Sequence, residues 1–494
     1  MKQPGRVVII GAGIGGLAAG AILSRDFAVD IVEARDRPGG KMRQIEIDDA
    51  RIDSGPTVFT MKWVFEDLFR RAGASFEDCL TLNQLEILAR HGWRDGSQLD
   101  LYADIDRSAE AIAEFAGTED GENYRAFCRR TEKAYRALKD SFLRAPKPSF
   151  ASLMTRANPF DVLATAPFST LWNTLGGQFH DPRLRQLFGR YSTYCGSSPF
   201  RAPGTLMLIA HVEQAGVWSL EGGMHALAQA LADIIAENGG RIHYGAPASK
   251  ISKIRGGGFE IEIAGGDAIK ADSVVFNGDR AALAGGLMGA EIGAAVPGYE
   301  KGKRSQSAIT WSAVAKTRGF DLATHSVFFS DDYEREFTSV FDESRPPEQP
   351  TTYIFAPDRD HAPGPQGENE RLFILINAPA SDDPKAYDKD MMEACWRRTR
   401  AHLKTCGLEI DGAPERRVAT SPSDFGAMFP GTGGALYGMA THGWQASFQR
   451  PGVKTRAPGL YAAGGSVHPG PGVPMAALSG MAAAEAIKRD RGLT

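Results

Sequence analysis

The stretch RVVIIGAGIGG, from Arg6 to Gly16, decides how this chain folds. It begins with a run of β-branched residues, which is typical of a buried parallel strand. The glycines after it fit the GxGxxG pattern of a dinucleotide-binding turn, and the apolar spacing that follows predicts a helix. Free N–H groups at such a helix start favour a pyrophosphate. The residues of this turn that we expect at the binding site are Gly11, Gly13, Ile14, Gly15 and Gly16.

A second predicted strand, Val29 to Val32, ends in Glu33, which lies 20 residues after Gly13. This is the separation at which a carboxylate reaches a ribose hydroxyl group. A GxGxxG motif alone is weak evidence, but a strand, glycines, a helix, a strand and an acid in this order predict a dinucleotide-binding unit. We expect Glu33 and Ala34 to line the site.

NAD and FAD share this fingerprint, so the next two segments have to separate them. ARDRPGGKMRQ, from Ala34 to Gln44, carries a second glycine pair beside basic residues, which suits a long cofactor clamped from a second loop. An ordinary surface turn explains this segment equally well. DSGPTVF, from Asp53 to Phe59, offers a further turn rich in backbone groups. The expected contacts in the two segments are Gly40, Lys41, Met42, Gly55, Pro56, Thr57 and Val58.

Together these segments resemble the FAD-dependent amine oxidase and phytoene desaturase superfamily. In that superfamily the acid, the glycine pair and the later turn line the flavin, so the resemblance implies FAD. A helix pattern from Met224 to Ile235, a hairpin and a buried strand at Val274 to Asn277 indicate where the cofactor fold resumes. The resemblance also implies that the backbone of Ala248 lies at the adenine edge.

PGLYAAGGSVHPGPGVPMAALSG, from Pro458 to Gly480, predicts a strand, a glycine pair and a helix with prolines before and at its start, where proline is tolerated. In the resembled superfamily this unit returns to the flavin, and its helix start stabilises the negative charge of the reduced ring. Gly465 stands where many flavoproteins carry an acid, which puts a side-chain contact there in doubt. The expected contacts are Gly464, Gly465, Pro474 and Met475.

Composition bounds the function. A chain of 494 residues is too long for one core, and a net charge of −4 argues against a general nucleic-acid role. Five scattered cysteines without metal-binding spacing read as reduced thiols of a cytoplasmic protein, and we expect no metal. The cofactor fold starts within six residues of Met1, so we expect no signal or transit peptide. We find no apolar stretch long enough to span a membrane.

The resemblance implies an α/β protein of the amine oxidase and phytoene desaturase type. We expect a discontinuous Rossmann-like FAD-binding domain, an inserted substrate-binding β-sheet domain and a helical, membrane-facing cap. The FAD-binding domain is expected at 1–75, 216–290 and 451–494, the helical cap at 76–215 and the sheet domain at 291–450.

The middle of the chain indicates a hydrophobic substrate. No charged residue occurs between Val162 and Phe179, whose aromatic side chains include Phe168 and Trp172. An interfacial segment at a membrane surface explains this composition, and a helical cap packed over the substrate cavity explains it as well.

Further motifs sharpen the resemblance toward bacterial carotenoid desaturases, and most of all toward the 1-hydroxycarotenoid 3,4-desaturases. The motifs are GRYSTYCGSSPFRAP (189–203), GVWSLEGGMHAL (216–227), FPGTGGALYGMATHGW (429–444) and HPGPGVPMAALSG (468–480). The resemblance implies a C3–C4 desaturase of 1-hydroxyneurosporene or a similar acyclic carotenoid. It also implies a cytoplasmic enzyme peripherally associated with the inner membrane, with oxygen or a quinone as electron acceptor.

Other functions stay open at this point. A phytoene or neurosporene desaturase, or a carotenoid isomerase, is compatible with the same scaffold. A lipid-binding carrier like the prenyl-protein escort proteins is a further alternative, although the intact glycines and Glu33 argue against it. We assign no catalytic residue: GxSxG and HExxH are absent, the histidines are dispersed, and desaturation can run mainly on the flavin. Neither Tyr191 nor His468, the candidates nearest to family motifs, receives a role.

Overall fold

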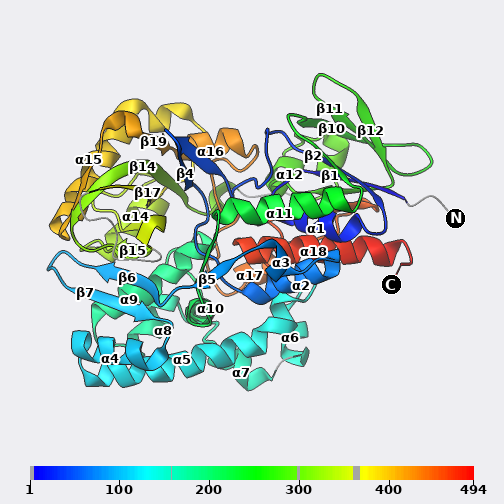
Figure 1. Cartoon of the computed structure of the whole chain (residues 1–494). Coiled ribbons are helices and arrows are strands. Elements are labelled where there is room, and N and C mark those ends of the chain that lie inside the picture. Colours follow the sequence, from blue (N-terminus) through cyan, green and yellow to red (C-terminus); the bar gives the residue numbers. More distant parts are fainter. Residues whose placement is uncertain (1–4, 157, 298–300, 360–367, 494) are drawn as a thin grey trace.

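The computed structural model describes residues 5–156, 158–297, 301–359 and 368–493. Its centre is a sheet of five parallel strands in the order β20-β13-β1-β2-β9 (Figure 1). The strands are β1 (Arg6–Ile10), β2 (Ala28–Val32), β9 (Arg241–His243), β13 (Ser273–Phe276) and β20 (Leu460–Ala462). Segments more than 200 residues apart in sequence therefore share one sheet, which confirms the discontinuous α/β fold predicted from the sequence.

The two faces of this sheet are covered differently. On one face Val7 and Ile9 pack against helices, and on the other Val8 and Ile10 pack against a three-stranded antiparallel sheet. Strand residues alternate between faces, so a continuous apolar run is what a doubly covered strand requires. The covering helices are α1 (Ile14–Leu23), α2 (Lys62–Ala72), α11 (Met224–Glu237) and α18 (Val473–Asp490), and the covering strands are β10 (Ala248–Lys253), β11 (Phe259–Ile263) and β12 (Ala268–Ala271).

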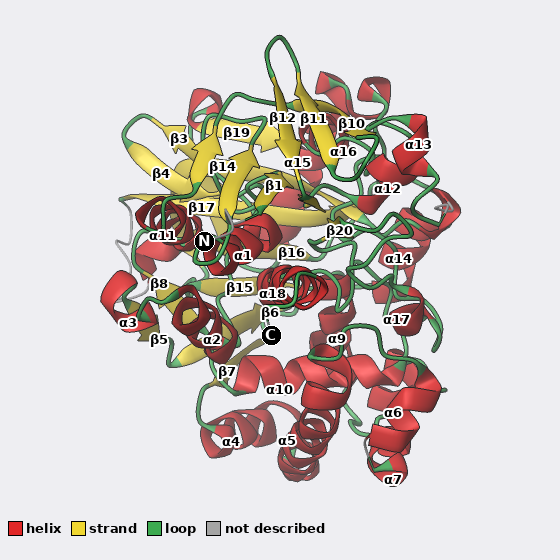
Figure 2. Cartoon of the chain, turned by 90° about the vertical axis from the view of Figure 1, so that its right-hand side faces the viewer, coloured by secondary structure: helices red, strands yellow, loops and turns green. Residues whose placement is uncertain are grey.

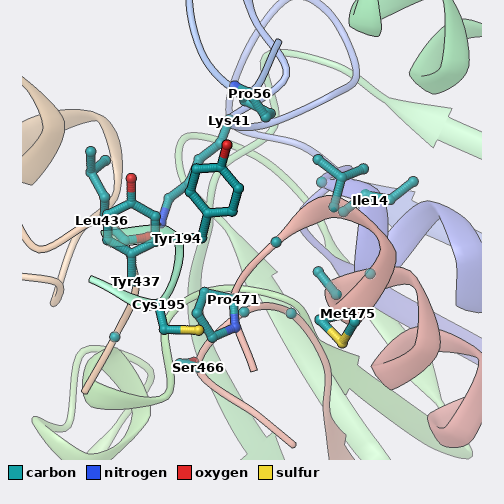
Figure 3. A pocket seen from close by; sticks show the side chains of 18 of the residues that line it. Ile14, Lys41, Pro56, Tyr194, Cys195, Leu436, Tyr437, Ser466, Pro471 and Met475 are labelled. Carbon is teal, nitrogen blue, oxygen red and sulfur yellow. The ribbon is translucent and has the colours of Figure 1, made fainter. Parts of the chain in front are cut away.

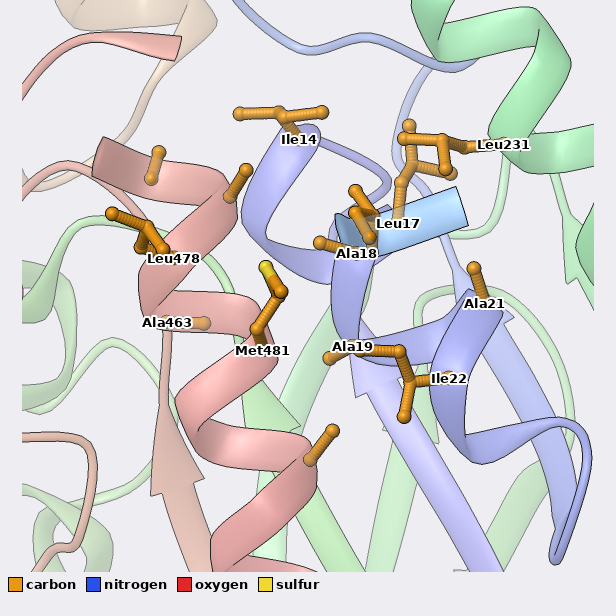
Figure 4. Close-up of a cluster of buried hydrophobic side chains, with 14 of the residues drawn as sticks. Ile14, Leu17, Ala18, Ala19, Ala21, Ile22, Leu231, Ala463, Leu478 and Met481 are labelled. Carbon is orange, nitrogen blue, oxygen red and sulfur yellow. The ribbon is translucent and has the colours of Figure 1, made fainter. Parts of the chain in front are cut away.

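Helices α1 and α18 lie side by side at very short range. Figure 4 shows Met481 of α18 directed toward Ala18 of α1. A Cβ atom added at Gly480 would lie 2.1 Å from the carbonyl oxygen of Gly15, so only glycine permits this approach. This contact places the glycine-rich turn before α1 close to the glycine-rich segment before α18, although the two lie near opposite ends of the sequence.

A second, larger sheet has mixed strand directions and follows the order β18-β14-β17-β16-β15-β6-β7, with β19 also paired to β14. Neighbouring strands are antiparallel except β6 and β15, which are parallel. The strands are β6 (Ile87–Gly92), β7 (Gln98–Tyr102), β14 (Ser307–Gly319), β15 (His325–Phe328), β16 (Thr352–Phe355), β17 (Asn369–Ala378), β18 (Leu408–Asp411) and β19 (Arg417–Thr420). Strands β6 and β7 belong to this sheet, so the segment 76–215 is not purely helical: it extends the large sheet.

Helices from the same segment form the part of the molecule away from β10–β12 (Figure 2). They enclose an aromatic core in which the rings of Phe179 and Phe188 stack 4.9 Å apart. Phe179 is only 1% exposed, so its apolar character serves packing and not a membrane surface. The helices are α4 (Ile105–Ala116), α5 (Thr118–Leu138), α6 (Phe150–Arg156), α7 (Pro159–Ala164), α8 (Leu171–Gly176), α9 (Pro182–Gly189) and α10 (Leu208–Gln214).

Smaller elements complete the fold. They are β3 (Gln44–Ile47), β4 (Ala50–Asp53), α3 (Phe76–Cys79), β5 (Leu82–Gln84), β8 (Trp218–Leu220), α12 (Arg280–Ala284), α13 (Ala290–Gly293), α14 (Tyr333–Phe341), α15 (Lys389–Thr405), α16 (Pro422–Met428) and α17 (Ala446–Gln449). None of the helices in the described residues is long and apolar enough to cross a membrane.

Candidate functional site

One cavity of about 930 Å³ begins at the carboxyl ends of β1, β2 and β13 and continues between the helices and the large sheet. Ligands of open α/β sheets bind at this edge, where the strands end and the helices begin. We call the part beside the GxGxxG turn the nucleotide end, and the part enclosed by α5, α10 and β16–β17 the chamber. The two parts are one continuous space.

The structure brings together almost all of the residues predicted from the sequence. Those that line the cavity are Gly11, Gly13, Ile14, Gly15, Glu33, Ala34, Gly40, Lys41, Met42, Gly55, Pro56, Thr57, Val58, Ala248, Gly464, Gly465, Pro474 and Met475. Gly16 is the exception. A Cβ atom there would lie 2.2 Å from the carbonyl oxygen of Gly11, so this glycine closes the turn and does not face the cavity.

Glu33 is fixed at the end of β2. Its Oε2 accepts a hydrogen bond from the backbone N–H of Ala12 at 2.6 Å, and its Oε1 accepts one from the N–H of Arg35 at 3.0 Å. The residue is only 6% exposed and lines the cavity. The carboxylate therefore has a defined position beside the glycine turn, as a ribose-binding acid requires.

Asn277, directly after β13, is a site residue that the sequence analysis missed. Its Nδ2 donates to the carbonyl oxygen of Gly11 at 3.1 Å, while its buried Oδ1 has no hydrogen-bond partner among the described residues. A Cβ atom at Gly15 would lie 2.6 Å from this Oδ1 and 2.8 Å from the backbone nitrogen of Gly464. Its place at the carboxyl end of a parallel strand was the available signal.

The start of α18 faces the same space. Its N-cap residue is Gly472, no side chain caps the first turn, and the residues from Gly472 to Met475 line the cavity. The N–H of Gly464 is not free, because it donates to Ser479 Oγ at 2.8 Å. Two helix starts without side-chain caps (α1 and α18), a glycine cradle and an unpaired buried acceptor fit a flavin dinucleotide.

The basic residues of the second glycine loop make contacts different from a phosphate clamp. Lys41 Nζ donates to the carbonyl oxygen of Leu436 at 2.5 Å, and burial lowers the pKa of Lys41 (Figure 3). Arg43 Nη2 donates to Thr420 Oγ1 at 2.8 Å, and burial lowers the pKa of Arg43 to about 10. Through these two hydrogen bonds the glycine loop contacts Thr420 and Leu436, which are almost 400 residues away in the sequence.

The chamber is mostly apolar. Its lining residues from the helical region include Leu138, Phe142, Leu143, Leu153, Val162, Leu206, Leu208, Ile209 and Val212. Near Trp444, which also lines the cavity, Phe168 is 62% exposed, and the two aromatic rings meet edge to face at 5.4 Å. A pair of exposed aromatic side chains therefore lies at the wall of an apolar space.

A group of ionisable side chains interrupts the apolar wall. Arg190, Tyr194 and Glu213 line the chamber, and Arg190 and Glu213 are 6% and 4% exposed. Arg190 Nη1 donates to the Tyr194 hydroxyl at 2.9 Å, and that hydroxyl donates to Glu213 Oε1 at 2.5 Å. Burial raises the pKa of Tyr194 well above its usual range, and these neighbours raise the pKa of Arg190 although burial opposes it.

His468 holds the chamber to the loop before α18. Its Nε2 donates to the carbonyl oxygen of Phe142 at 2.9 Å, and its ring packs edge to face on Phe142. Burial lowers the pKa of His468 to about 4, so the ring is neutral at pH 7. Tyr191 is fully buried and donates to Glu213 Oε2 at 2.6 Å. The hydrogen bonds made by His468 Nε2 and by the Tyr191 hydroxyl are therefore both within the protein.

Comparisons with known proteins agree with this geometry. The model of the family "Flavin containing amine oxidoreductase" matches residues 14–488. The hydroxyneurosporene desaturase of Rubrivivax gelatinosus is 47% identical over 98% of this chain and 93% of its own length. The hydroxyneurosporene desaturase of Cereibacter sphaeroides is 43% identical over 98% of both chains. An oxidoreductase from Methanosarcina mazei shares the fold, with a TM-score of 0.62, 17% identity and coverage of 97% of this chain and 100% of its own.

The family match covers nearly the whole chain, and the cavity contains the features that a flavin dinucleotide requires. The chain therefore belongs to the flavin-containing amine oxidoreductase family, in the group of carotenoid desaturases that includes the hydroxyneurosporene desaturases.

Proposed function

We propose that the protein is an FAD-dependent desaturase that introduces the C3–C4 double bond into a 1-hydroxylated acyclic carotenoid such as 1-hydroxyneurosporene. One observation carries the proposal: the nucleotide end and a long apolar chamber form a single cavity. A polyene in the chamber would reach the cofactor without passing through water. The names of relatives that are 42–47% identical support the same substrate class.

The nucleotide end supplies the proposed cofactor contacts. Glu33 would bind the ribose hydroxyls, the start of α1 the pyrophosphate, and the backbone near Ala248 the adenine. Gly465, Pro474 and Met475 would place the start of α18 against the ring system. When bound, the flavin would accept one hydrogen with two electrons as a hydride, and the second hydrogen that the substrate loses would leave as a proton. On this proposal the segments 1–75, 216–290 and 451–494 hold the cofactor.

The segments 76–215 and 291–450 would then bind and position the substrate. The apolar side chains of α5 and α10 would order the polyene and exclude water from the bond that reacts. Holding two reacting groups in the right geometry replaces a bimolecular encounter, which is a large part of the catalytic effect in such enzymes. We assign no residue as the base that takes the proton.

The substrate is tested by comparing carotenoids that differ in one group. Purified enzyme is incubated without oxygen in liposomes that contain phytoene, neurosporene or 1-hydroxyneurosporene, a quinone and then oxygen are supplied separately, and products are resolved by chromatography. We expect strong preference for the hydroxylated polyene, because a site built for a hydroxyl group rejects the analogue that lacks it by up to about 10⁴–10⁵. Equal turnover of phytoene or neurosporene would favour a general desaturase.

Two further outcomes would point to other functions on the same scaffold. A changed double-bond geometry without an added double bond would indicate an isomerase. Protein that binds the polyene but purifies without flavin would indicate a carrier. The same experiment identifies the electron acceptor, either oxygen or a quinone.

We further propose that the protein binds peripherally to the cytoplasmic face of the inner membrane at the mouth of the chamber. The exposed pair Phe168 and Trp444 supports this, since aromatic side chains insert at the bilayer interface. Trp172 is partly buried against the helical core, and Phe179 is inaccessible, so neither belongs to this surface. A substrate that is itself dissolved in the bilayer would enter directly.

Liposome sedimentation tests this surface. Phe168→Ser with Trp444→Ser should reduce the bound fraction several-fold, because two apolar side chains no longer enter the interface. Leu493→Ser is the control, since Leu493 is 53% exposed at the far end of the chain. Equal binding by the double variant and the wild type would place the membrane contact elsewhere.

A further inference from the structure

The ionisable group in the chamber wall is not satisfied by its own contacts. Arg190 Nε is buried and has no hydrogen-bond partner among the described residues. The Tyr194 hydroxyl accepts one hydrogen bond from Arg190 and donates one to Glu213, which leaves a second acceptor position on its oxygen. Arg190 Nη2 lies 3.6 Å from Glu213 Oε1, so the two opposite charges are paired.

Burying these charged side chains costs free energy. The cost of removing a carboxylate and a guanidinium from water is offset only when their hydrogen bonds are complete. Apolar residues of similar size often give a protein equal or greater stability. Here the group lies on the wall of an apolar cavity and retains unused hydrogen-bonding capacity. Polar side chains with unused hydrogen-bonding capacity on the wall of an apolar cavity indicate a ligand that is mostly apolar and carries one polar group.

The position of the group within the cavity is informative. Figure 3 shows Tyr194 among the side chains that line the cavity, together with Lys41 and Tyr437. Tyr437 packs on the same turn, since a Cβ atom at Gly196 would lie 2.6 Å from it. Burial raises the pKa of Tyr353, and Arg190 and Glu213 are close enough to affect it as well. The Tyr353 hydroxyl also shares a hydrogen bond of 2.6 Å with Thr57, in the turn where cofactor contacts are expected. The group therefore lies near this turn.

The chemistry of the proposed substrate requires a polar group in that part of the cavity. The hydroxyl on C1 is separated from C3 by two bonds beyond its own, so when the C3–C4 bond reacts the hydroxyl must lie close to the cofactor. An alcohol donates one hydrogen bond and accepts others. The unpaired N–H of Arg190 and the remaining acceptor position of Tyr194 complement both functions.

We infer that Arg190, Tyr194 and Glu213 form the specificity site that binds the terminal tertiary hydroxyl group of the carotenoid. Arg190 and Tyr194 contact the alcohol, and Glu213 holds both in position. This inference rests on the proposed function and deepens it, because it names the residues that separate a hydroxylated polyene from the hydrocarbon. The same contacts set which bond of the polyene lies at the flavin.

The test compares two substrates in holoenzyme variants. Tyr194→Phe removes only the hydroxyl, and the double variant Arg190→Met with Glu213→Leu removes both charges together. Tyr191→Phe is the matched control: it removes an equally short hydrogen bond to Glu213 from a side chain that does not line the cavity. For each protein, kcat/KM is measured with 1-hydroxyneurosporene and with neurosporene in liposomes. Dissociation constants are obtained separately from the quenching of tryptophan fluorescence by each polyene.

We expect the ratio of the two kcat/KM values to fall by about 10- to 100-fold in the double variant, the usual effect of a hydrogen bond to a charged group. In Tyr194→Phe the ratio should fall by roughly 2- to 10-fold, because the phenol is neutral. Activity toward neurosporene should persist, and Tyr191→Phe should keep the wild-type ratio. An unchanged ratio in Tyr194→Phe, or an equal loss with both substrates, would overturn the inference.

The two proposals fail in different ways. If the wild-type enzyme converts neither polyene, the proposed function is wrong. The dissociation constants still decide the specificity site in that case: it stands only if Tyr194→Phe weakens binding of the hydroxylated polyene and leaves binding of the hydrocarbon unchanged.

Discussion

Backbone atoms form most of the wall of the nucleotide end, whereas side chains form the wall of the chamber. At the nucleotide end the cavity wall is mainly backbone: glycines, two helix starts without side-chain caps, and Glu33, whose carboxylate is held by neighbouring N–H groups. In the chamber the wall is made of side chains, and its charges are held by other side chains such as Tyr194. A backbone site tolerates few changes of shape, whereas a side-chain site can change its specificity one residue at a time.

This difference predicts different consequences of mutation. A change at the nucleotide end should weaken cofactor binding with a modest effect on the fold. A change in the charged group of the chamber should destabilise the fold itself, because Arg190 and Glu213 are buried and Tyr194, which is partly buried, bonds to both.

The largest effect is expected for Glu213→Leu. This change leaves the charge of Arg190 buried without its partner, which should lower the free energy of unfolding by about 3–5 kcal/mol. Denaturant unfolding followed by circular dichroism measures the loss. Adding Arg190→Met should restore most of the stability, because the buried charge is removed as well. If the single variant is as stable as the wild type, the chamber does not differ from the nucleotide end in this respect.

A smaller effect, on cofactor binding, is expected for Glu33→Ala. The ribose hydroxyls would lose a charged acceptor, which should weaken FAD binding by about 1.5–3 kcal/mol. The flavin absorbance of desalted protein gives the occupancy. Glu33→Gln separates the lost charge from the lost contact to Ala12, and Glu46→Ala serves as an exposed control in the nearby strand β3. Full occupancy in Glu33→Ala would contradict the assignment of the ribose site.

The smallest effect at neutral pH is expected where the two regions meet, at His468, whose contribution appears only as the pH falls. The folded protein keeps this ring neutral down to about pH 4, whereas the unfolded chain binds a proton below about 6.5. Between these values the unfolded state holds more protons, so stability falls with decreasing pH by about 1.4 kcal/mol per pH unit from this residue. His442, whose pKa burial also lowers to about 4, adds a similar contribution.

His468→Gln retains a donor for the carbonyl of Phe142 but cannot titrate. The slope of unfolding free energy against pH should therefore be shallower in this variant between about pH 6.5 and pH 4. Denaturant titrations at several pH values measure it. An identical slope in the variant and the wild type would show that His468 gains its proton in both states.

The sequence alone identified the fold and most of the nucleotide end. Val7 to Glu33 places a strand, a turn, a helix, a strand and an acid within one short segment, and local spacing is enough to predict such a unit. Gly464 and Gly465 could be recognised for the same reason, since they follow a strand and precede a helix, whereas Gly39 and Gly40 lie in a loop and were assigned through the family resemblance. Gly16 was predicted as a cofactor-binding residue, but in the structure the carbonyl of Gly11 fills the space beside it, and Gly16 does not line the cavity.

Only the tertiary structure revealed Asn277 and the charged group of the chamber. Asn277 lies 266 residues from Gly11, and Arg190 lies 23 residues from Glu213 on a different helical segment. No local periodicity relates such positions. The apolar segment near Phe179 was equally ambiguous, because composition alone cannot distinguish a buried aromatic side chain from one that faces a bilayer. Backbone motifs are local and can be read in order along the chain, but a cavity wall made of side chains exists only after distant segments have packed together.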